Sequence, residues 1–164
     1  MNEVQQKTLK ISEEARWLFR AGEQYKNAFY LLIGEFSVVS GSWNNDIEWP
    51  SYYCGGFAFE SFFKSYLKIR RINFTKIHDL GALMDLDKTE MVAFFEFQEA
   101  EIFQIKMLNE RYDYHESYGK YDLRYPTKPG LRKSPHPDGL NSILNKMYRK
   151  LMEESPKIKP DVTE

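Results

Sequence analysis

The sequence predicts an all-α protein with four long helices and one short helix. Apolar residues recur every three or four positions along most of the chain, which is the spacing of one helix face. No stretch shows the apolar and polar alternation of a half-buried strand, and no repeat appears at solenoid periods. With 164 residues, 42% of them apolar, the chain suits a single domain, residues 1–164, in which aromatic rings supply much of the core.

The first helix is predicted to begin at Ser12, which suits an N-cap. Gly34 and the polar residues 37–45 end its pattern in a loop. Its apolar face is Ala15, Leu18, Gly22, Tyr25, Phe29, Leu32 and Phe36.

The second helix is predicted to begin near Pro50, because proline suits the first turn, and to run to about Arg71. The Gly55-Gly56 pair costs about 1 kcal/mol per residue relative to alanine, so we expect it to allow a neighbouring helix to approach closely. Cys54, on the same aromatic helix, is expected to be a small core residue.

After a connector at residues 73–77, the spacing predicts a short helix over residues 79–86. Asp87 and Glu90 then have the positions of a capping box, which begins the next helix. Helical spacing continues to about Tyr118, either as one long helix or as two helices broken near Phe97. The inward residues of the short helix are Leu80, Leu83 and Met84.

Residues 119–137 are predicted to form a long loop, because four prolines and a glycine follow Gly119 at close intervals. Asp138 is in position to cap a closing helix that ends near Leu151. The core is therefore expected over about residues 12–151, and residues 155–164 are expected to be a frayed tail.

Three short motifs together resemble the HEPN domain family over roughly residues 12–151. They are Glu60 and Lys64 four apart on the second helix, His78-Asp79-Leu80 at the start of the short helix, and Arg124-Tyr125-Pro126 after the fourth helix. The resemblance implies an antiparallel helical bundle, commonly a homodimer, that acts around RNA or nucleotides. Some members are metal-independent ribonucleases and toxins; others accompany a nucleotidyltransferase or lack catalysis.

The ribonuclease members carry an arginine, four to six further residues and a histidine late in the bundle. Here Arg111 and His115 have only three residues between them. Arg71 and His78 have the right separation, but they flank the second and third helices. These departures favour a binding role without strong catalysis.

Arg111 and His115 are nevertheless candidate catalytic residues. On a continuous helix their spacing would place both on one face, where the guanidinium could hold a phosphate while the imidazole transfers a proton. The alternative is an exposed polar face, because the surrounding residues are Asn109, Glu110, Asp113 and Glu116.

A polar clasp is the second candidate site. Asp79 suits the N-cap of the short helix, where its charge also complements the helix dipole. Glu60 and Lys64 stabilise a helix by only about 0.2–0.5 kcal/mol if exposed. Buried against His78 or Arg124, the pair would instead link two elements. We favour this clasp, with Glu60, Lys64, His78 and Asp79 as its members.

The long loop is the candidate nucleic-acid site. The loop contains five basic residues and a single acidic one, Asp122, and Tyr121 and Tyr125 lie among them. Basic side chains suit phosphates, and the tyrosine rings suit stacking on unpaired bases. The alternative is a solvated loop whose tyrosines pack on the bundle. Residues 79–101, in contrast, hold seven acids against Lys88 alone, which could orient a polyanion or pair two subunits. The basic residues are Lys120, Arg124, Lys128, Arg132 and Lys133.

Several classes of function are not expected. The three histidines lack a metal-ligand spacing and no P-loop occurs, so we predict no metal and no cofactor. A single cysteine excludes an internal disulfide framework. No charged and apolar leader and no run of about 18 apolar residues is present, so we expect a cytoplasmic protein outside the membrane.

The sequence thus predicts a homodimeric HEPN-like bundle that binds RNA, a nucleotide or a partner such as a nucleotidyltransferase, without strong catalysis. One alternative is a toxin-like, metal-independent endoribonuclease that uses Arg111 and His115. The other is a protein-interaction module of a toxin and antitoxin pair.

Overall fold

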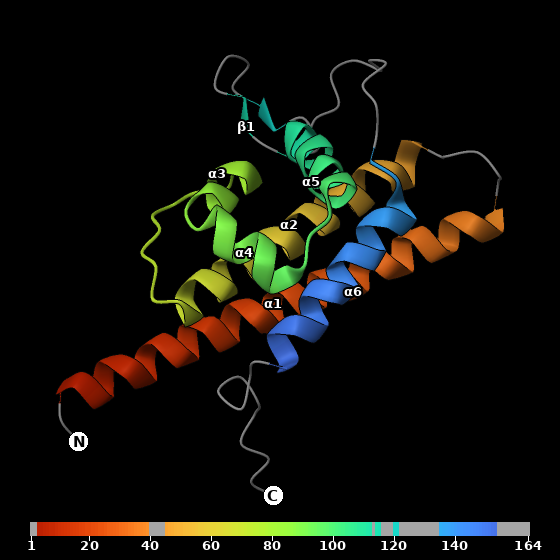
Figure 1. The fold of residues 1–164 in the computed structure, drawn as a ribbon. Helices are drawn as coiled ribbons and strands as arrows, with labels where there is room; N and C mark the ends of the chain where they lie inside the picture. The colour runs from red at the N-terminus through yellow and green to blue at the C-terminus, as the bar shows by residue number, and fades with distance from the viewer. Residues whose placement is uncertain (1–2, 40–44, 113, 116–119, 122–134, 154–164) are drawn as a thin grey trace, which may run out of the picture.

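The computed structural model describes residues 3–39, 45–112, 114–115, 120–121 and 135–153. Its side chains are described over residues 13–34, 50–110 and 135–153. Two-residue strands, β1 (Tyr114–His115) and β2 (Lys120–Tyr121), accompany the helices (Figure 1). The helices are α1 (Glu3–Val39), α2 (Asn45–Ile69), α3 (Leu80–Asp85), α4 (Lys88–Phe95), α5 (Glu99–Tyr112) and α6 (Pro137–Glu153).

The predicted all-α class is confirmed, with two short helices, α3 and α4, in place of one. The helix α1 is a long rod, α2 and α6 pack against it, and α3 to α5 lie beyond α2 (Figure 1). Both α2 and α6 run antiparallel to α1. For α6 this follows because Tyr148 stacks on Phe19 while Asn145, earlier in α6, accepts a bond from Lys26, later in α1.

The helix α2 lies at the centre of the molecule, and none of its residues from Ser51 to Ile69 is exposed. Aromatic rings on α2 contact rings on the neighbouring elements: Phe63 meets Phe95 and Phe97, and Phe62 meets Phe19. Such ring pairs add specificity to the burial of apolar area. The expected aromatic core is present.

Two glycines let α1 and α2 approach closely, as the sequence predicts for Gly55. A Cβ atom on Gly55 would lie 3.3 Å from the ring of Phe29 on α1. A Cβ atom on Gly22 would lie 2.5 Å from the ring of Phe62 on α2, closer than van der Waals contact allows. Each helix therefore presents a glycine to an aromatic ring of the other.

Two helices end in the same turn, with a residue other than glycine in the left-handed region. Arg71 has a φ of 61° and follows α2, and Glu96 has a φ of 55° and follows α4. In each case the next amide donates to a carbonyl five residues back, Ile72 to Leu67 at 2.8 Å and Phe97 to Val92 at 3.0 Å, as in a Schellman motif. The sequence left open whether residues 88–118 form one helix or two. The structure has two, α4 and α5, separated by residues 96–98.

Four predicted helix starts or ends are wrong, and one of them is the end near Tyr118, because α5 ends at Tyr112. The helix α1 begins at Glu3, not Ser12, because residues 3–11 contain neither glycine nor proline. It also passes through Gly34, whose cost of about 1 kcal/mol does not end a long helix. The helix α2 begins at Asn45, so Pro50 lies inside it, where it has no N–H to donate.

The two predicted N-caps have different outcomes. Asp79 caps α3, because its side chain accepts from the backbone N–H of Ala82 at 2.7 Å. The predicted capping box at Asp87 is wrong, because Asp87 makes no side-chain cap bond. Its carboxylate instead accepts from the hydroxyl of Tyr66 at 2.9 Å, because a buried tyrosine hydroxyl needs a partner.

Substituting Gly22 by alanine should destabilise the protein by about 1–3 kcal/mol, because the new methyl group overlaps the ring of Phe62. The matched control is Gly34→Ala, in the same helix, where nothing lies within 4 Å of the added Cβ atom. That variant should gain up to about 1 kcal/mol from helix propensity. Urea unfolding measures both changes, and an equal effect would contradict the close packing of α1 on α2.

Tyr66 should make stability fall in alkaline solution. Burial, and then the bond to Asp87, raise the pKa of Tyr66 well above its ordinary value. The unfolded chain therefore releases this proton first, and the free energy of unfolding falls as pH rises above about 10. The Tyr66→Phe variant should lose less stability between neutral and alkaline pH than the unchanged protein. Tyr30→Phe is the control, because Tyr30 is exposed, and it should not alter this loss. Unfolding measured between neutral and alkaline pH tests the difference.

Candidate functional site

A buried carboxylate joins α2 to the connector before α3. The Oε1 atom of Glu60 accepts from Nζ of Lys64 at 2.6 Å and lies 3.1 Å from Nδ1 of His78. The side chains of Glu60 and Lys64 are 8% and 12% exposed, whereas that of His78 is 51% exposed. These three residues form the clasp that the sequence analysis favours over an exposed pair.

The local sequence explains this geometry. Glu60 and Lys64 are one turn apart, so they meet on one side of α2, and the surrounding elements remove that side from water. A charge buried in this way needs a partner of opposite sign and further hydrogen bonds. The chain turns back at Arg71, and the connector then brings His78 to the same carboxylate.

The clasp gives His78 a fixed orientation at the surface. When Nδ1 donates to the carboxylate of Glu60, the remaining ring nitrogen, Nε2, is an acceptor. A carboxylate that orients a half-exposed imidazole in this way suits proton transfer through Nε2. Lys64 supplies a positive charge beside the same carboxylate.

Asp79 is not a member of the clasp, which corrects the sequence prediction. It caps α3 and also accepts from Nδ2 of Asn109 on α5 at 3.1 Å. In turn, Oδ1 of Asn109 accepts from the backbone N–H of Leu80 at 2.7 Å. Asn109 therefore ties the last turns of α5 to the first turn of α3. The sequence analysis missed this role, although an asparagine inside a helix is a weak signal for such a contact.

The argument that places Arg111 and His115 on one helix face is wrong. The helix α5 ends at Tyr112, and His115 lies in β1, where it pairs with Lys120 of β2. The aspartate, tyrosine and histidine that follow Tyr112 have low helix propensity, so the helical spacing of the sequence does not extend α5. The side chains of Arg111 and His115 lie outside the described residues.

The predicted nucleic-acid residues also fall largely outside the described part of the chain. Lys120 is placed through its backbone in β2. Binding by these residues stays a prediction. The others, Arg124, Lys128, Arg132 and Lys133, lie in residues 122–134, which the structure does not describe.

The return of the chain after this segment is fixed by two bonds. The carbonyl of Pro135 accepts from the hydroxyl of Tyr52 on α2 at 2.8 Å, and the N–H of His136 donates to Oε1 of Gln104 on α5 at 2.7 Å. The segment therefore leaves from the end of α5 and returns beside the middle of the same helix.

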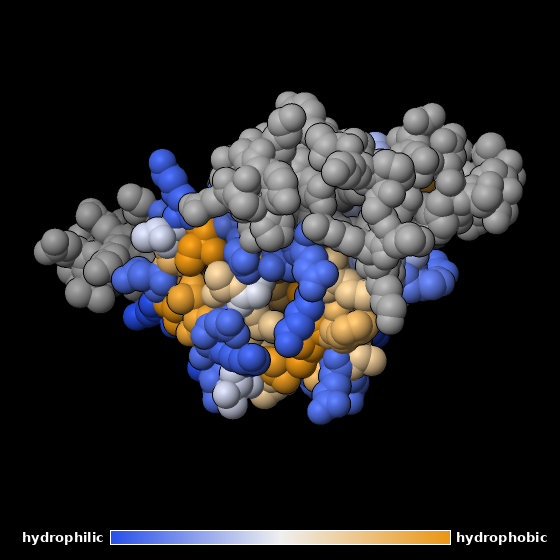
Figure 2. Space-filling model, turned by 90° about the horizontal axis from the view of Figure 1, so that it is seen from above, coloured by the Kyte–Doolittle hydropathy of each residue, from blue (hydrophilic) through white to orange (hydrophobic). Residues whose placement is uncertain are grey.

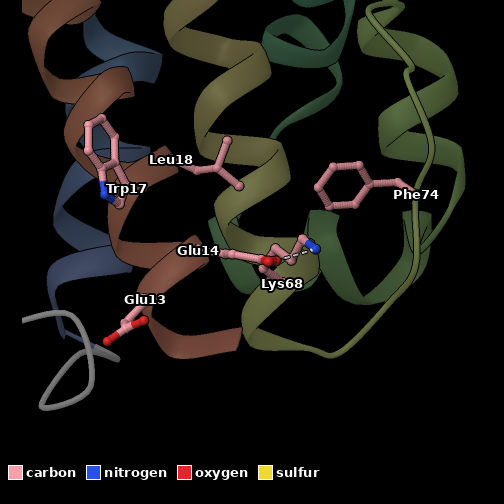
Figure 3. A pocket seen from close by; sticks show the side chains of 6 residues that line it. All are labelled: Glu13, Glu14, Trp17, Leu18, Lys68 and Phe74. Atoms are coloured by element: carbon pink, nitrogen blue, oxygen red, sulfur yellow. Dashed lines mark ion pairs between the residues drawn. The ribbon is translucent and has the colours of Figure 1, made fainter. Parts of the chain in front are cut away.

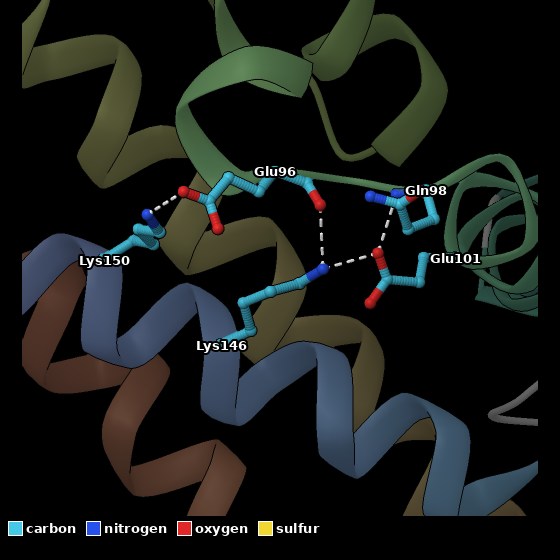
Figure 4. Close-up of polar contacts among 5 residues, drawn as sticks. All are labelled: Glu96, Gln98, Glu101, Lys146 and Lys150. Atoms are coloured by element: carbon cyan, nitrogen blue, oxygen red, sulfur yellow. Dashed lines mark hydrogen bonds and ion pairs between the residues drawn. The ribbon is translucent and has the colours of Figure 1, made fainter.

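The acidic stretch is neutralised by bases from other helices. Lys146 of α6 donates to the carbonyl of Glu96 at 3.0 Å and to the carboxylate of Glu101 at 2.5 Å, and Lys150 pairs with the carboxylate of Glu96 (Figure 4). The bond to Lys150 lowers the pKa of Glu96. Arg70, just after α2, lies near two further acids of this stretch. The charge asymmetry seen in the sequence is thus smaller in the folded chain.

Apolar surface is also exposed among these charges. Seen from above, hydrophobic residues lie between hydrophilic side chains next to the residues drawn in grey (Figure 2). Phe103 of α5 is 55% exposed and Leu86, just after α3, is 40% exposed. Single exposed apolar side chains are normal on protein surfaces, so these two residues do not by themselves mark a binding face.

Other chemistries find little support in the described residues. Cys54 is half-buried, and burial raises the pKa of its thiol, which disfavours a reactive thiolate. Within the same ranges, no three histidine, cysteine, aspartate or glutamate side chains gather as metal ligands. None of the helices described is both long and apolar enough to cross a membrane.

Comparisons with protein-family models, with curated proteins and with solved structures found no match to this chain. The resemblance to the HEPN family therefore remains a prediction that depends on the motifs quoted above.

Substituting Glu60 by glutamine should cost about 1–3 kcal/mol, because Lys64 and His78 lose the charge of their shared acceptor while the amide oxygen still accepts a bond. Glu90→Gln is the matched control, since Glu90 is 60% exposed and lies 3.7 Å from Arg70. That change should stay within about 0.5 kcal/mol. Urea unfolding compares the two, and equal values would show that the clasp contributes nothing to stability.

Proposed function

We propose that this chain is a HEPN-like helical bundle that binds RNA or a nucleotide at the end of the molecule where α3 begins and α5 ends. The observation that carries the proposal is the pair of bonds from Asn109 to Asp79 and Leu80. These bonds support the proposal because they fix the point from which the basic segment departs.

The helix rise supports the same location. Tyr112, the last residue of α5, lies about 4.5 Å along the axis from Asn109. Asn109 bonds to residues that directly follow His78. The pairing of His115 with Lys120 follows within a few residues. The basic segment therefore starts close to the clasp, and its charges can act together with His78.

The chemistry of these groups suits a polyanion. Lysine and arginine side chains bind phosphates and release counterions, and tyrosines between them stack on unpaired bases. In the proposed site Lys120, Arg124, Lys128, Arg132 and Lys133 contact the phosphates, and His78 in its protonated form adds a donor through Nε2. Because α5 does not present Arg111 and His115 on one helix face, the proposal includes no strong catalysis.

The proposal keeps the partners that the resemblance implies. The bundle acts as a homodimer, and a nucleotidyltransferase or the other member of a toxin and antitoxin pair is its protein partner. Such a partner would bring or remove the RNA or nucleotide.

Binding should be measured by fluorescence anisotropy of a labelled, mixed-sequence single-stranded RNA, at several salt concentrations. A fourfold variant, with Arg124, Lys128, Arg132 and Lys133 all changed to alanine, should bind more weakly. The slope of log affinity against log salt should fall by about 3, because each lost contact to a single strand removes about 0.7. Unlabelled mononucleotide, added as a competitor, separates binding of a base and phosphate from binding of the polymer.

The matched control removes two arginines and two lysines elsewhere. Arg20, Lys76, Lys106 and Arg149 are all exposed and lie on α1, the connector, α5 and α6. The variant with all four changed to alanine should have nearly the same RNA affinity, and the same slope of log affinity against log salt, as the unchanged protein. No binding at low salt, or an equal loss in both variants, would overturn the proposed function.

A further inference from the structure

An open groove lies beside the first half of α1, on the side of the molecule where α2 ends (Figure 3). Its volume is about 450 Å³. Trp17 forms part of its wall and is 78% exposed, an unusual position for so large an apolar side chain. The lining residues are Glu13, Glu14, Trp17 and Leu18 of α1, Lys68 of α2 and Phe74 of the connector.

The groove combines apolar walls with a negative rim. Glu14 pairs with Lys68 at 2.6 Å, and the same ammonium group lies 5.2 Å from the centre of the Phe74 ring. The lining thus includes two carboxylates and one ammonium group, a difference of one negative charge. A peptide that fits this groove would pack an aliphatic side chain against Trp17 and Leu18 and carry a positive charge on each side of that residue.

The end of α6 lies at the level of this groove. Tyr148 stacks on Phe19 with 5.3 Å between ring centres, and the two helices are antiparallel. Glu153 is about 7.5 Å further along α6, and Glu14 is about 7.5 Å along α1 in the same direction. The chain after Glu153 therefore continues from a point beside Glu14.

We propose that the groove is the docking site of this chain's own C-terminal segment, residues 154–164. The segment contains Pro156-Lys157-Ile158-Lys159-Pro160, an aliphatic residue between two lysines. Ile158 packs against Trp17 and Leu18, and the lysines meet Glu13 and Glu14. The prolines favour an extended chain, which lowers the entropy lost on docking.

The segment is long enough for this path. Ile158 is five positions after Glu153, and those five steps span about 16–18 Å when the chain is extended. This exceeds the width of about 10–12 Å of the helix that the segment crosses. A tethered segment also has an effective concentration on the order of millimolar, so a few contacts suffice for it to outcompete a separate chain.

The test places a spin label on the segment and observes Trp17 in the full chain. Val162 is changed to cysteine in a Cys54→Ala background, and tryptophan is labelled with ¹⁵N. The three indole signals belong to Trp17, Trp43 and Trp49, and Trp17→Phe assigns the first of them. The Trp17 signal should lose most of its intensity when the label is paramagnetic, and Ile158→Asp should restore it.

Thr163→Asp is the matched control, because it adds the same charge to the segment but keeps the lysines and Ile158. It should leave the loss of intensity unchanged, whereas the double change Lys157→Glu and Lys159→Glu should reverse it. Acrylamide quenching of a Trp43→Phe, Trp49→Phe variant repeats the test with Cys54 kept, and quenching of Trp17 should increase with Ile158→Asp.

Three outcomes would overturn the proposal. They are a Trp17 signal insensitive to the label, a loss of intensity that Ile158→Asp does not change, and a loss that appears when the label and the isotope are on different molecules. The last outcome would assign the groove to the segment of a second copy. RNA binding is measured separately and does not depend on this result.

Discussion

The position of α2 is the constraint on which the other elements depend. Because no residue from Ser51 to Ile69 is exposed, each polar group on this helix must find a partner inside the protein. Ser65 donates to the carbonyl of Ala15 on α1 at 2.9 Å, and Tyr66 donates to Asp87 at the start of α4. Tyr52 donates to the chain just before α6, and Glu60 receives His78 from the connector. Four polar side chains on one buried helix thus fix the places of four other segments.

The same constraint explains how much of the fold could be predicted. The apolar spacing gives the existence of the helices, because burial of one face follows from sequence alone. Their ends are less predictable. Asp79 and Asp87 are the same residue type in similar positions, yet Asp79 caps a helix and Asp87 turns to Tyr66. The choice depends on a tyrosine 21 positions earlier in the sequence, which no local pattern contains. The break at Glu96 is similar, because a glutamate there adopts a conformation that favours glycine while Lys146 and Lys150 hold it.

The candidate site shows the same division between local and distant information. Glu60 and Lys64 are one helical turn apart, so their contact could be predicted, and the position of His78 at a helix start indicated a link. The role of Asn109 could not be predicted, because its partners are about 30 residues away and its own surroundings look like an ordinary polar helix face. The spacing of Arg111 and His115 is a local pattern, and here the local pattern gave a wrong prediction. It assumed that the helix continues past Tyr112, where α5 ends.

The bonds of Asn109, Gln104 and Tyr52 also have a consequence for binding. These bonds fix the two places where residues 113–134 leave and rejoin the described core. The entropy lost in bringing the ends of this segment together is therefore already offset when the core folds. A ligand that orders the segment then loses less conformational freedom than it would on an unanchored chain of equal length. Because these anchors are internal hydrogen bonds, the described core determines where this segment begins and where it ends. A polyanion would therefore meet a surface whose position is set by α2, although none of the proposed phosphate contacts belongs to that helix.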